Sequence, residues 1–390
     1  MKSDERKVKS CGNRILLLAG EESGLLYANE LKKRLVGNEI RGYQDYGFET
    51  HDLAVMGFLP VLLKIRYFLR VKRTMERVID EWKPDVVLTV DYPGLNLKLA
   101  AYAHEKGVRT VHVVCPQVWA WKKGRIPKIE AVLDRLCCFL PFEPKLFRPG
   151  FATFVGHPLA QAFVRPGDGP TAEGGKTTTG SRLVALLPGS RKGEIEKILP
   201  TLLKAAERLH ADLGERVRFV IPAATARAYR QIEALLKPAH SSFVTLQHGG
   251  ARDLLRRADC AAVASGTATL EAALARCPTV LVYRMGRLLW WIAGLVIKTR
   301  FAGLANVIWE RCREGGEVVE DRIVNREMQS PDQPMPELLQ ENFSEESVAR
   351  YLRGCLVDDA VRLDAVRRLD SAMRYLQTES DPFANIIAEL

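Results

Sequence analysis

The sequence predicts an α/β protein built from two doubly wound parallel sheets. Short runs of consecutive apolar residues alternate along the 390 residues with longer stretches whose apolar positions recur at helical spacing. Continuously apolar strands are typical of parallel sheets that are covered by helices on both faces. A stretch rich in Gly, Pro, Thr and Ser at 165–181 separates two halves of similar length, as a linker between two domains would.

In the first half, strands are expected at 14–19, 85–90 and 110–114, and helices are expected near 25–35 and 97–106. A glycine-rich turn follows the first of these strands, and a Pro-Gly turn follows the second. The repeated order of strand, turn and helix is the unit from which doubly wound sheets are built.

The second half repeats this alternation. Strands are expected at 183–187, 217–221, 243–246, 260–264 and 279–283. A helix is expected at 194–213.

This pattern predicts a domain organisation. We assign 1–164 to an N-terminal domain, 182–350 to a C-terminal domain, and 351–390 to C-terminal helices that could pack back on the N-terminal domain. Two such domains would face a cleft. Because open parallel sheets bind ligands beyond the carboxyl ends of their strands, functional residues are expected in the turns after strands.

The composition is that of an ordinary globular protein. The hydrophobic fraction of 47% and the charged fraction of 27% exclude wholesale disorder and fibrous repeats. The longest apolar run, 288–297, has ten residues, whereas a membrane-spanning helix needs about twenty. Residues 1–12 are polar and lack the apolar core of a signal peptide. We therefore expect a cytoplasmic location.

Cysteine usage and charge narrow the classes of partner. The eight cysteines form no Cys-x-x-Cys pair and do not cluster with the seven histidines, so reduced thiols are favoured over zinc or disulfides. The net charge is +10, and residues 1–160 carry +8 of it, with 26 Lys and Arg against 18 Asp and Glu. This asymmetry indicates an anionic partner: nucleic acid, acidic lipid or a phosphorylated substrate.

Three turns of the first half carry candidate site residues. The turn after the first strand, GEESG, offers Gly20, Glu21, Ser23 and Gly24 at the start of a helix, where glycines allow a ligand to approach closely. A plain turn would have the same pattern. Asp91 follows the strand at 85–90 and has the position of a general base, although a turn-forming aspartate is equally compatible.

The third turn, VWAWKKGR at 118–125, combines aromatic and basic residues. Trp119, Trp121 and Arg125 suit a sugar ring, a base or a phosphate. Packing of the tryptophans in the core is the alternative.

Two turns of the second half suit a nucleotide diphosphate. Gly189, Ser190 and Arg191 offer backbone N–H groups, a hydroxyl and a guanidinium at a helix N-terminus. The second turn, SGT, comprises Ser265, Gly266 and Thr267. Glu271, which follows it, could accept both hydroxyls of a ribose or could simply be a solvated helix carboxylate.

These stretches together resemble the lipid-A-disaccharide synthase family of two-domain glycosyltransferases. The resemblance covers about 300 residues in family order and rests on GEESG, LAVMG, KPDVVLTVDYPGLNLKLA, VVCPQVWAWKKGRI, LPFEP, VGHPLA, LLPGSRKGEI, ASGTATLEAALARCPTVLVYRM and GLANVI. It implies the GT-B architecture, in which two Rossmann-like domains face a cleft.

The resemblance also implies an activity. The family transfers 2,3-diacylglucosamine from UDP-2,3-diacylglucosamine to 2,3-diacylglucosamine 1-phosphate, with inversion, and forms a β-1,6-linked disaccharide phosphate and UDP. No metal or other cofactor is implied. Asp91 matches the family's essential aspartate, the expected base, whereas Arg191, the SGT turn and Glu271 match the UDP site. Asn306 matches an asparagine of the family's cleft, and the resemblance groups it with the UDP-binding residues.

The chain departs from the family pattern at several positions. Leu25 stands where the family has an acid after GEASG, and Cys115 and Gln117 replace serines in VSPSVWAW. A polar insertion of about 20 residues lies within 309–333 and is expected to be a surface excursion.

Other functions remain open at this point. Another UDP-dependent GT-B enzyme, such as a sugar-nucleotide epimerase or the peptidoglycan lipid-intermediate transferase, would share the UDP site but would not explain VWAWKKGR. A basic membrane-binding or nucleic-acid-binding module would leave the turns of the second half unexplained. We therefore expect no nucleic-acid partner, and a homodimer is left open.

The segment from Leu53 to Arg73 predicts contact with anionic lipid of the inner leaflet. Apolar positions from 61 onward approximate a helical stripe, and the basic residues are Lys64, Arg66, Arg70, Lys72 and Arg73. The alternative is a core-facing helix with a basic outer face. Lipid contact would make the protein peripheral on the inner face of the inner membrane.

Overall fold

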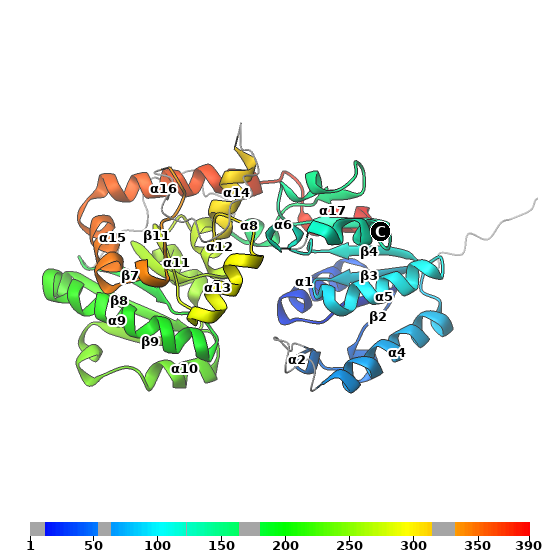
Figure 1. Cartoon of the computed structure of the whole chain (residues 1–390), viewed down its shortest axis with the longest axis horizontal. Coiled ribbons are helices and arrows are strands. Elements are labelled where there is room, and N and C mark those ends of the chain that lie inside the picture. The colour runs from blue at the N-terminus through cyan, green and yellow to red at the C-terminus, as the bar shows by residue number, and fades with distance from the viewer. Residues whose placement is uncertain (1–11, 54–63, 122, 164–179, 314–331) are drawn as a thin grey trace, which may run out of the picture. The chain divides into compact units, whose positions relative to one another are not determined.

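The structure is a computed structural model that describes residues 12–53, 64–121, 123–163, 180–313 and 332–390 (Figure 1). It divides into two compact units. The first comprises Met1–Pro158 and Thr378–Leu390, and the second comprises Leu159–Gln377.

The first unit contains a six-stranded sheet in the order β2-β1-β3-β4-β5-β6, and every neighbouring pair is parallel. Its strands are β1 (Arg14–Ala19), β2 (Glu39–Arg41), β3 (Val86–Val90), β4 (Arg109–Val113), β5 (Arg135–Cys138) and β6 (Ala152–Phe154).

Helices cover both faces of this sheet. They are α1 (Glu22–Arg34), α2 (Thr50–Leu53), α4 (Ile65–Trp82), α5 (Pro93–Glu105), α6 (Val118–Trp121), α7 (Ile126–Glu130) and α17 (Pro382–Ala388). Alternate residues of β1 enter different cores: Leu17 packs with α1 and α17, whereas Leu16 and Leu18 pack with α4 and α5. Because both faces of the strand are buried, its sequence is apolar without alternation.

The second unit contains a second parallel sheet, in the order β12-β11-β10-β7-β8-β9. Its strands are β7 (Arg182–Leu187), β8 (Val217–Ala223), β9 (Val244–His248), β10 (Cys260–Ala264), β11 (Thr279–Tyr283) and β12 (Glu337–Leu339).

Helices again lie on both faces. Those of the second unit are α9 (Lys192–Leu213), α10 (Ala226–Glu233), α11 (Ala251–Arg257), α12 (Thr267–Leu274), α13 (Arg287–Val296), α14 (Leu304–Cys312), α15 (Glu345–Val357) and α16 (Asp359–Met373), while α8 (Pro158–Phe163) begins at the unit boundary. One core joins α9 and α15 to the sheet, and another joins α11 and α12 to its other face. The predicted architecture of two doubly wound parallel sheets is confirmed.

The C-terminal region is divided between the units. We expected 351–390 to form C-terminal helices that could pack back on the N-terminal domain; the structure places Thr378–Leu390 in the first unit and residues up to Gln377 in the second. The buried side chains of Phe383 and Ile386 attach α17 to the first unit's core, and Asn385 Nδ2 donates to the Val155 carbonyl at 3.0 Å. The expected linker lies almost wholly outside the described residues.

Candidate active site

The strand orders place the predicted turns at one position in each sheet. In the first sheet β1 lies between β2 and β3, and in the second β7 lies between β8 and β10, so the strand order reverses beside β1 and beside β7. Such switch points are where open parallel sheets bind ligands. Residues 20–24 and Asp91 follow β1 and β3, whereas residues 188–191 and 265–267 follow β7 and β10.

Asp91 lies in a strained turn at the first switch point. Asp91 and Tyr92 have φ values of +49° and +52°, and such left-handed conformations of non-glycine residues cost on the order of 1–3 kcal/mol each. The Asp91 amide donates to the Val113 carbonyl of β4 at 2.9 Å, and the carboxylate Oδ1 accepts from the Tyr92 amide at 2.8 Å. The turn is therefore held from a neighbouring strand as well as locally.

Asn96 holds this turn through hydrogen bonds from its side chain to backbone carbonyls. Its fully buried side chain donates from Nδ2 to the carbonyls of Leu18, Val90 and Asp91, at 3.2, 3.3 and 2.8 Å, and its Oδ1 accepts from the Tyr43 hydroxyl at 2.7 Å. One amide thus joins the ends of β1 and β3 to the Asp91 backbone. Sequence analysis did not single out Asn96, although it is a polar residue on an otherwise apolar helix face.

Burial shifts the pKa of the Asp91 carboxyl. Desolvation raises the pKa of Asp91 above its ordinary value, and the hydrogen bond from the Tyr92 amide opposes this shift. A higher pKa makes the carboxylate a stronger proton acceptor, as a general base requires. Burial, together with the nearby charge of Glu21, raises the pKa of Tyr92 to about 12.

The glycines after β1 allow the two turns to meet. A Cβ atom at Gly20 would lie 2.3 Å from Cδ1 of Tyr92, and one at Gly24 would lie 3.1 Å from the Val90 carbonyl oxygen. A side chain at Gly20 would collide with Tyr92, and one at Gly24 would crowd the end of β3 just before Asp91. Ser23 lies in α1, but its side chain is outside the described part of the structure.

The tryptophans of VWAW have different environments. Trp119 is buried, donates from Nε1 to Glu143 Oε1 at 3.0 Å, and packs edge-on against Phe142. Trp121 is 42% exposed, and Arg125 is half-buried in the turn that follows. Core packing therefore accounts for Trp119, whereas Trp121 and Arg125 remain accessible to a ligand.

A buried group of Cys115, Cys138 and Glu143 lies beneath this turn, with its ligand-type atoms within 4.8 Å of one another. Glu143 already accepts hydrogen bonds from Trp119 and from the Leu140 amide. Burial raises the pKa of the Cys138 thiol well above its ordinary value, which opposes the thiolate form that metals require. The group has three donors, one fewer than a structural zinc site.

At the second switch point, the N-terminus of α9 is closed by its own glutamate. The amides of Ser190 and Arg191 donate to Glu194 Oε2 at 3.3 and 3.4 Å, and Arg191 Nη1 lies 3.1 Å from Glu194 Oε1. Gly189, with φ of +101°, is needed because a Cβ atom there would lie 2.5 Å from Glu194 Oε2. Glu194, which sequence analysis missed, is thus bound where we expected a phosphate.

The SGT turn lies next to α9, because β10 pairs directly with β7. The Ser265 amide donates to the Val282 carbonyl at 3.2 Å, and its hydroxyl donates to the Ala302 carbonyl at 3.4 Å. Gly266 and Thr267 are exposed at the start of α12. Glu271 pairs with Arg252 at 3.5 Å and is therefore not simply a solvated carboxylate.

Asn306 is fully buried and supports a neighbouring turn. Its Nδ2 donates to the Met335 carbonyl at 2.8 Å and to Glu337 Oε1 at 2.9 Å, and its Oδ1 accepts from the Met335 amide at 3.0 Å. Glu337 also accepts from the amides of Ala302 and Gly303. The Asn306 amide group therefore shapes the turn before α14, and Glu337 is a third residue that sequence analysis missed.

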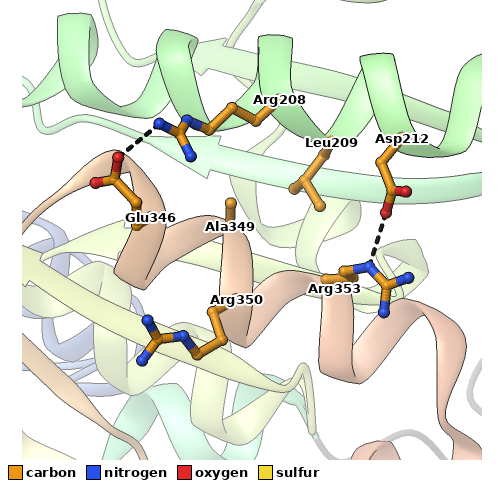
Figure 2. A pocket seen from close by; sticks show the side chains of 7 residues that line it. All are labelled: Arg208, Leu209, Asp212, Glu346, Ala349, Arg350 and Arg353. Carbon is orange, nitrogen blue, oxygen red and sulfur yellow. Dashed lines mark hydrogen bonds and ion pairs between the residues drawn. The ribbon is translucent and has the colours of Figure 1, made fainter.

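A pocket between α9 and α15 lies apart from these turns (Figure 2). Figure 2 shows Arg208 paired with Glu346 and Arg353 paired with Asp212, at 2.6 and 2.7 Å. Arg208 is roughly 25 Å along α9 from its N-terminus, at 1.5 Å per residue. The pocket is therefore remote from the second switch point.

The family model described as lipid-A-disaccharide synthetase matches residues 15–327. The chain belongs to this family. A Pseudomonas putida lipid-A-disaccharide synthase is 33% identical over 382 residues, covering 94% of this chain and 95% of the relative. The lipid-A-disaccharide synthase of Azotobacter vinelandii is 34% identical over 357 residues, covering 87% and 88% of the two chains. The predicted family and its glycosyltransferase class are confirmed.

Solved structures share the fold at low sequence identity. The Staphylococcus aureus MnaA–UDP co-structure has a TM-score of 0.57 at 12% identity, covering 96% of this chain and 94% of that chain. The spinosyn rhamnosyltransferase SpnG complexed with thymidine diphosphate has a TM-score of 0.52 at 13% identity, covering 97% and 99%. These likenesses confirm the predicted GT-B architecture.

Proposed function

We propose that the chain transfers 2,3-diacylglucosamine from UDP-2,3-diacylglucosamine to the 6-hydroxyl of 2,3-diacylglucosamine 1-phosphate, with inversion at the anomeric carbon. The products are the β-1,6-linked disaccharide 1-phosphate and UDP. Family membership supports the reaction. The observation that carries the mechanism is the position of Asp91 in a strained, anchored turn at the first switch point.

Asp91 serves as the base. The acceptor's 6-hydroxyl oxygen forms a bond to the donor's anomeric carbon, the bond from that carbon to UDP breaks, and the hydroxyl proton passes to the Asp91 carboxylate. Removal of the proton in the transition state is worth about 10²–10⁴ in rate. Trp121 and Arg125 are accessible on the same unit and suit the acceptor's sugar ring and phosphate.

UDP binds at the second switch point. Without a ligand, the amides of Ser190 and Arg191 and the Arg191 guanidinium donate to Glu194. When UDP binds, these groups donate to the oxygens of its diphosphate instead. These groups, with the SGT turn, stabilise the charge that develops on the departing UDP. Glu271 is assigned to the ribose, and Asn306 is assigned as a positioning residue.

Peripheral membrane association is part of the proposal because both substrates are lipids. Residues 54–63 of the predicted lipid-binding segment lie outside the described residues. In α4, Val71 and Met75 are buried against the sheet. The exposed residues up to Arg73, where the predicted segment ends, are Ile65, Arg66, Leu69, Arg70 and Arg73, and acidic side chains are exposed only further along the helix, at Asp80 and Glu81. This outer face combines apolar and basic side chains, as contact with the anionic inner leaflet requires. Among the described helices, none is both long and apolar enough to cross a bilayer.

The test is an assay of purified protein with both acylated glucosamine substrates, in which mass spectrometry follows the disaccharide phosphate and a coupled assay follows UDP. We expect one UDP for each disaccharide, and activity that survives added chelator. An epimerised UDP-sugar, or UDP release without disaccharide, would contradict the proposal. Sedimentation of the same sample tests for a homodimer.

A further inference from the structure

Helix α13 exposes an unusual amount of apolar surface. Six of the fourteen large hydrophobic side chains exposed in the described part of the chain lie on this ten-residue helix: Leu288, Leu289, Trp291, Ile292, Leu295 and Val296. Leu288 is 71% exposed and Trp291 is 64% exposed. Packing within its own unit therefore does not explain why α13 is so apolar.

The exposed residues form a continuous stripe. Leu288, Trp291, Ile292 and Leu295 follow the i, i+3, i+4, i+7 spacing of one helix face. Gly294 is the only residue of the helix that is buried. The helix, labelled α13 in Figure 1, thus exposes its apolar side chains instead of burying them in the core of the second unit.

The charged residues near α13 in the sequence have one sign. Residues 272–309 contain no Asp or Glu but contain five basic residues. Two of these are used internally, since Arg276 pairs with Asp370 at 2.7 Å and Arg284 donates to the Phe343 carbonyl. Arg287 and Lys298 are exposed at the two ends of the helix.

We propose that α13 is a membrane-contact helix of the second unit. Leu288, Trp291, Ile292 and Leu295 enter the boundary between headgroups and acyl chains of an anionic bilayer, and Arg287 and Lys298 contact its headgroups. An apolar face with basic flanks and a tryptophan is the pattern of helices that lie in this interface. The absence of acids favours a lipid surface because each nearby carboxylate would be repelled by anionic headgroups.

This inference goes beyond the proposed function. It places a lipid contact on the unit assigned to UDP, independent of the segment that ends at Arg73. The two contacts can be tested separately, because they lie in different units and can be changed by different substitutions.

The first experiment is flotation with phosphatidylcholine vesicles, with and without phosphatidylglycerol. The α13 variant carries Leu288→Ser, Trp291→Ser, Ile292→Ser and Leu295→Ser. Its matched control carries Val357→Ser, Val361→Ser and Leu363→Ser, which remove other exposed apolar side chains of the same unit. We expect the α13 variant to bind anionic vesicles roughly tenfold or more weakly, because it loses apolar area to bury. The control should bind like wild type, and all three proteins should retain UDP binding.

The second experiment uses lipids brominated on their acyl chains, which quench nearby tryptophan. Quenching of wild-type fluorescence should fall in Trp291→Phe. It should persist in Trp309→Phe, because Trp309 is 8% exposed and cannot reach the lipid.

Several outcomes would overturn the inference. Equal vesicle binding by wild type and the α13 variant would do so, as would failure of wild type to float or an equal loss in the control. A variant with Lys64, Arg66, Arg70, Lys72 and Arg73 changed to Gln separates the two contacts: if it alone loses binding, the first unit's contact stands and α13 has no role. A wild-type dimer that the α13 substitutions dissociate without changing vesicle binding would assign α13 to a second copy.

Discussion

Hydrogen bonds to the backbone N–H and C=O groups of Asp91 hold this residue in place. In its carboxylate, Oδ1 accepts the hydrogen bond from the Tyr92 amide and Oδ2 does not. A neighbouring strand and the following helix both contribute to this arrangement: the Val113 carbonyl of β4 accepts from the Asp91 amide, and Asn96 of α5 donates to the Asp91 carbonyl. The strain of two successive left-handed residues persists because these bonds overdetermine the turn. A base held in this way needs little reorganisation when the acceptor arrives.

Changing Asp91→Asn should lower turnover by roughly 10²–10⁴. The amide keeps the side chain's shape and can accept the Tyr92 hydrogen bond, but it cannot accept the proton. UDP affinity should be unchanged when measured by calorimetry. Asp80→Asn, which removes an exposed carboxylate of the same unit, is the control. Near-normal turnover in Asp91→Asn would make Asp91 a turn residue only.

The raised pKa of Asp91 also predicts a pH dependence of stability. The folded state holds the Asp91 proton more tightly than the unfolded state, so stability falls as the pH rises from the ordinary aspartate pKa through the folded-state pKa. Asp91→Asn should therefore melt at a higher temperature than wild type at neutral pH, and the difference should shrink on acidification through this range. A difference that grows on acidification would contradict the assigned direction.

Changing Asn96→Ala should affect both stability and turnover. It leaves the buried Tyr43 hydroxyl without its acceptor and three carbonyls without their shared donor, at about 1–3 kcal/mol for a buried group left unsatisfied. Turnover should fall further than the loss of folded protein explains, with KM for the donor unchanged, because the Asp91 turn relaxes. Tyr43→Phe, which removes only the hydroxyl, should keep most of the turnover. Unchanged turnover in folded Asn96→Ala would show that the Asp91 turn keeps its conformation without the Asn96 hydrogen bonds.

At the scale of elements, the N-terminus of α9 already carries one anion, the carboxylate of Glu194. Glu194 occupies the amides and the guanidinium that the diphosphate is proposed to take. The glutamate satisfies the helix end when no ligand is bound, in the manner of a capping box. Under the proposed function, binding of UDP at this helix would include the displacement of the Glu194 carboxylate.

Arg191→Ala should weaken UDP binding by about 1.5–3 kcal/mol, the worth of a hydrogen bond to a charged group. Lys192→Ala, one residue further along the same surface, should have little effect, because its exposed side chain lies 3.7 Å from Glu196 rather than at the turn. Calorimetric titration with UDP measures both. Equal losses in the two variants would indicate general electrostatic attraction in place of a specific contact.

Particular elements show what the sequence could predict. The expected bounds of β1, β10 and β11 match the structure because these strands are continuous apolar runs. The edge strands β2, β6 and β12 were missed because each has three residues, too few for a periodic pattern. The switch-point turns could be placed because they directly follow predicted strands.

The contacts that Asn96 and Asn306 make with distant backbone groups could not be predicted from patterns of residue types, and Asn306 was singled out only through the family resemblance. Asn96 binds the Leu18 carbonyl 78 residues away, and Asn306 binds Met335 29 residues away. Neither partner is a polar side chain, so no pattern of residue types marks these contacts. Glu194 was missed for another reason: its carboxylate occupies the site that its neighbours were expected to offer to a ligand.

At the scale of the whole molecule, the first unit is completed by residues from the other end of the chain. Phe383 and Ile386 enter its core, Arg34 pairs with Asp381 at 3.3 Å, and Arg135 pairs with Glu389 at 3.2 Å. The first unit is therefore discontinuous in sequence, whereas the second is one uninterrupted stretch.

Changing Phe383→Ala should destabilise the first unit by about 3–5 kcal/mol, because a large buried side chain is lost from its core. Leu363→Ala, an exposed position of the second unit, should change stability by less than about 0.5 kcal/mol. Denaturant unfolding followed by limited proteolysis would show which unit opens first. Preferential opening of the second unit in Phe383→Ala would contradict this account of α17.

The discontinuity has a consequence for synthesis. Domains generally fold as units while the chain emerges from the ribosome, with the N-terminal domain first. Here residues 378–390 are made after all of the second unit, so the first unit waits for its last helix while the second can already close. During that interval the core surface later covered by Phe383 and Ile386 stays open to the surrounding solution. The unit whose synthesis begins first is thus the one that finishes folding last.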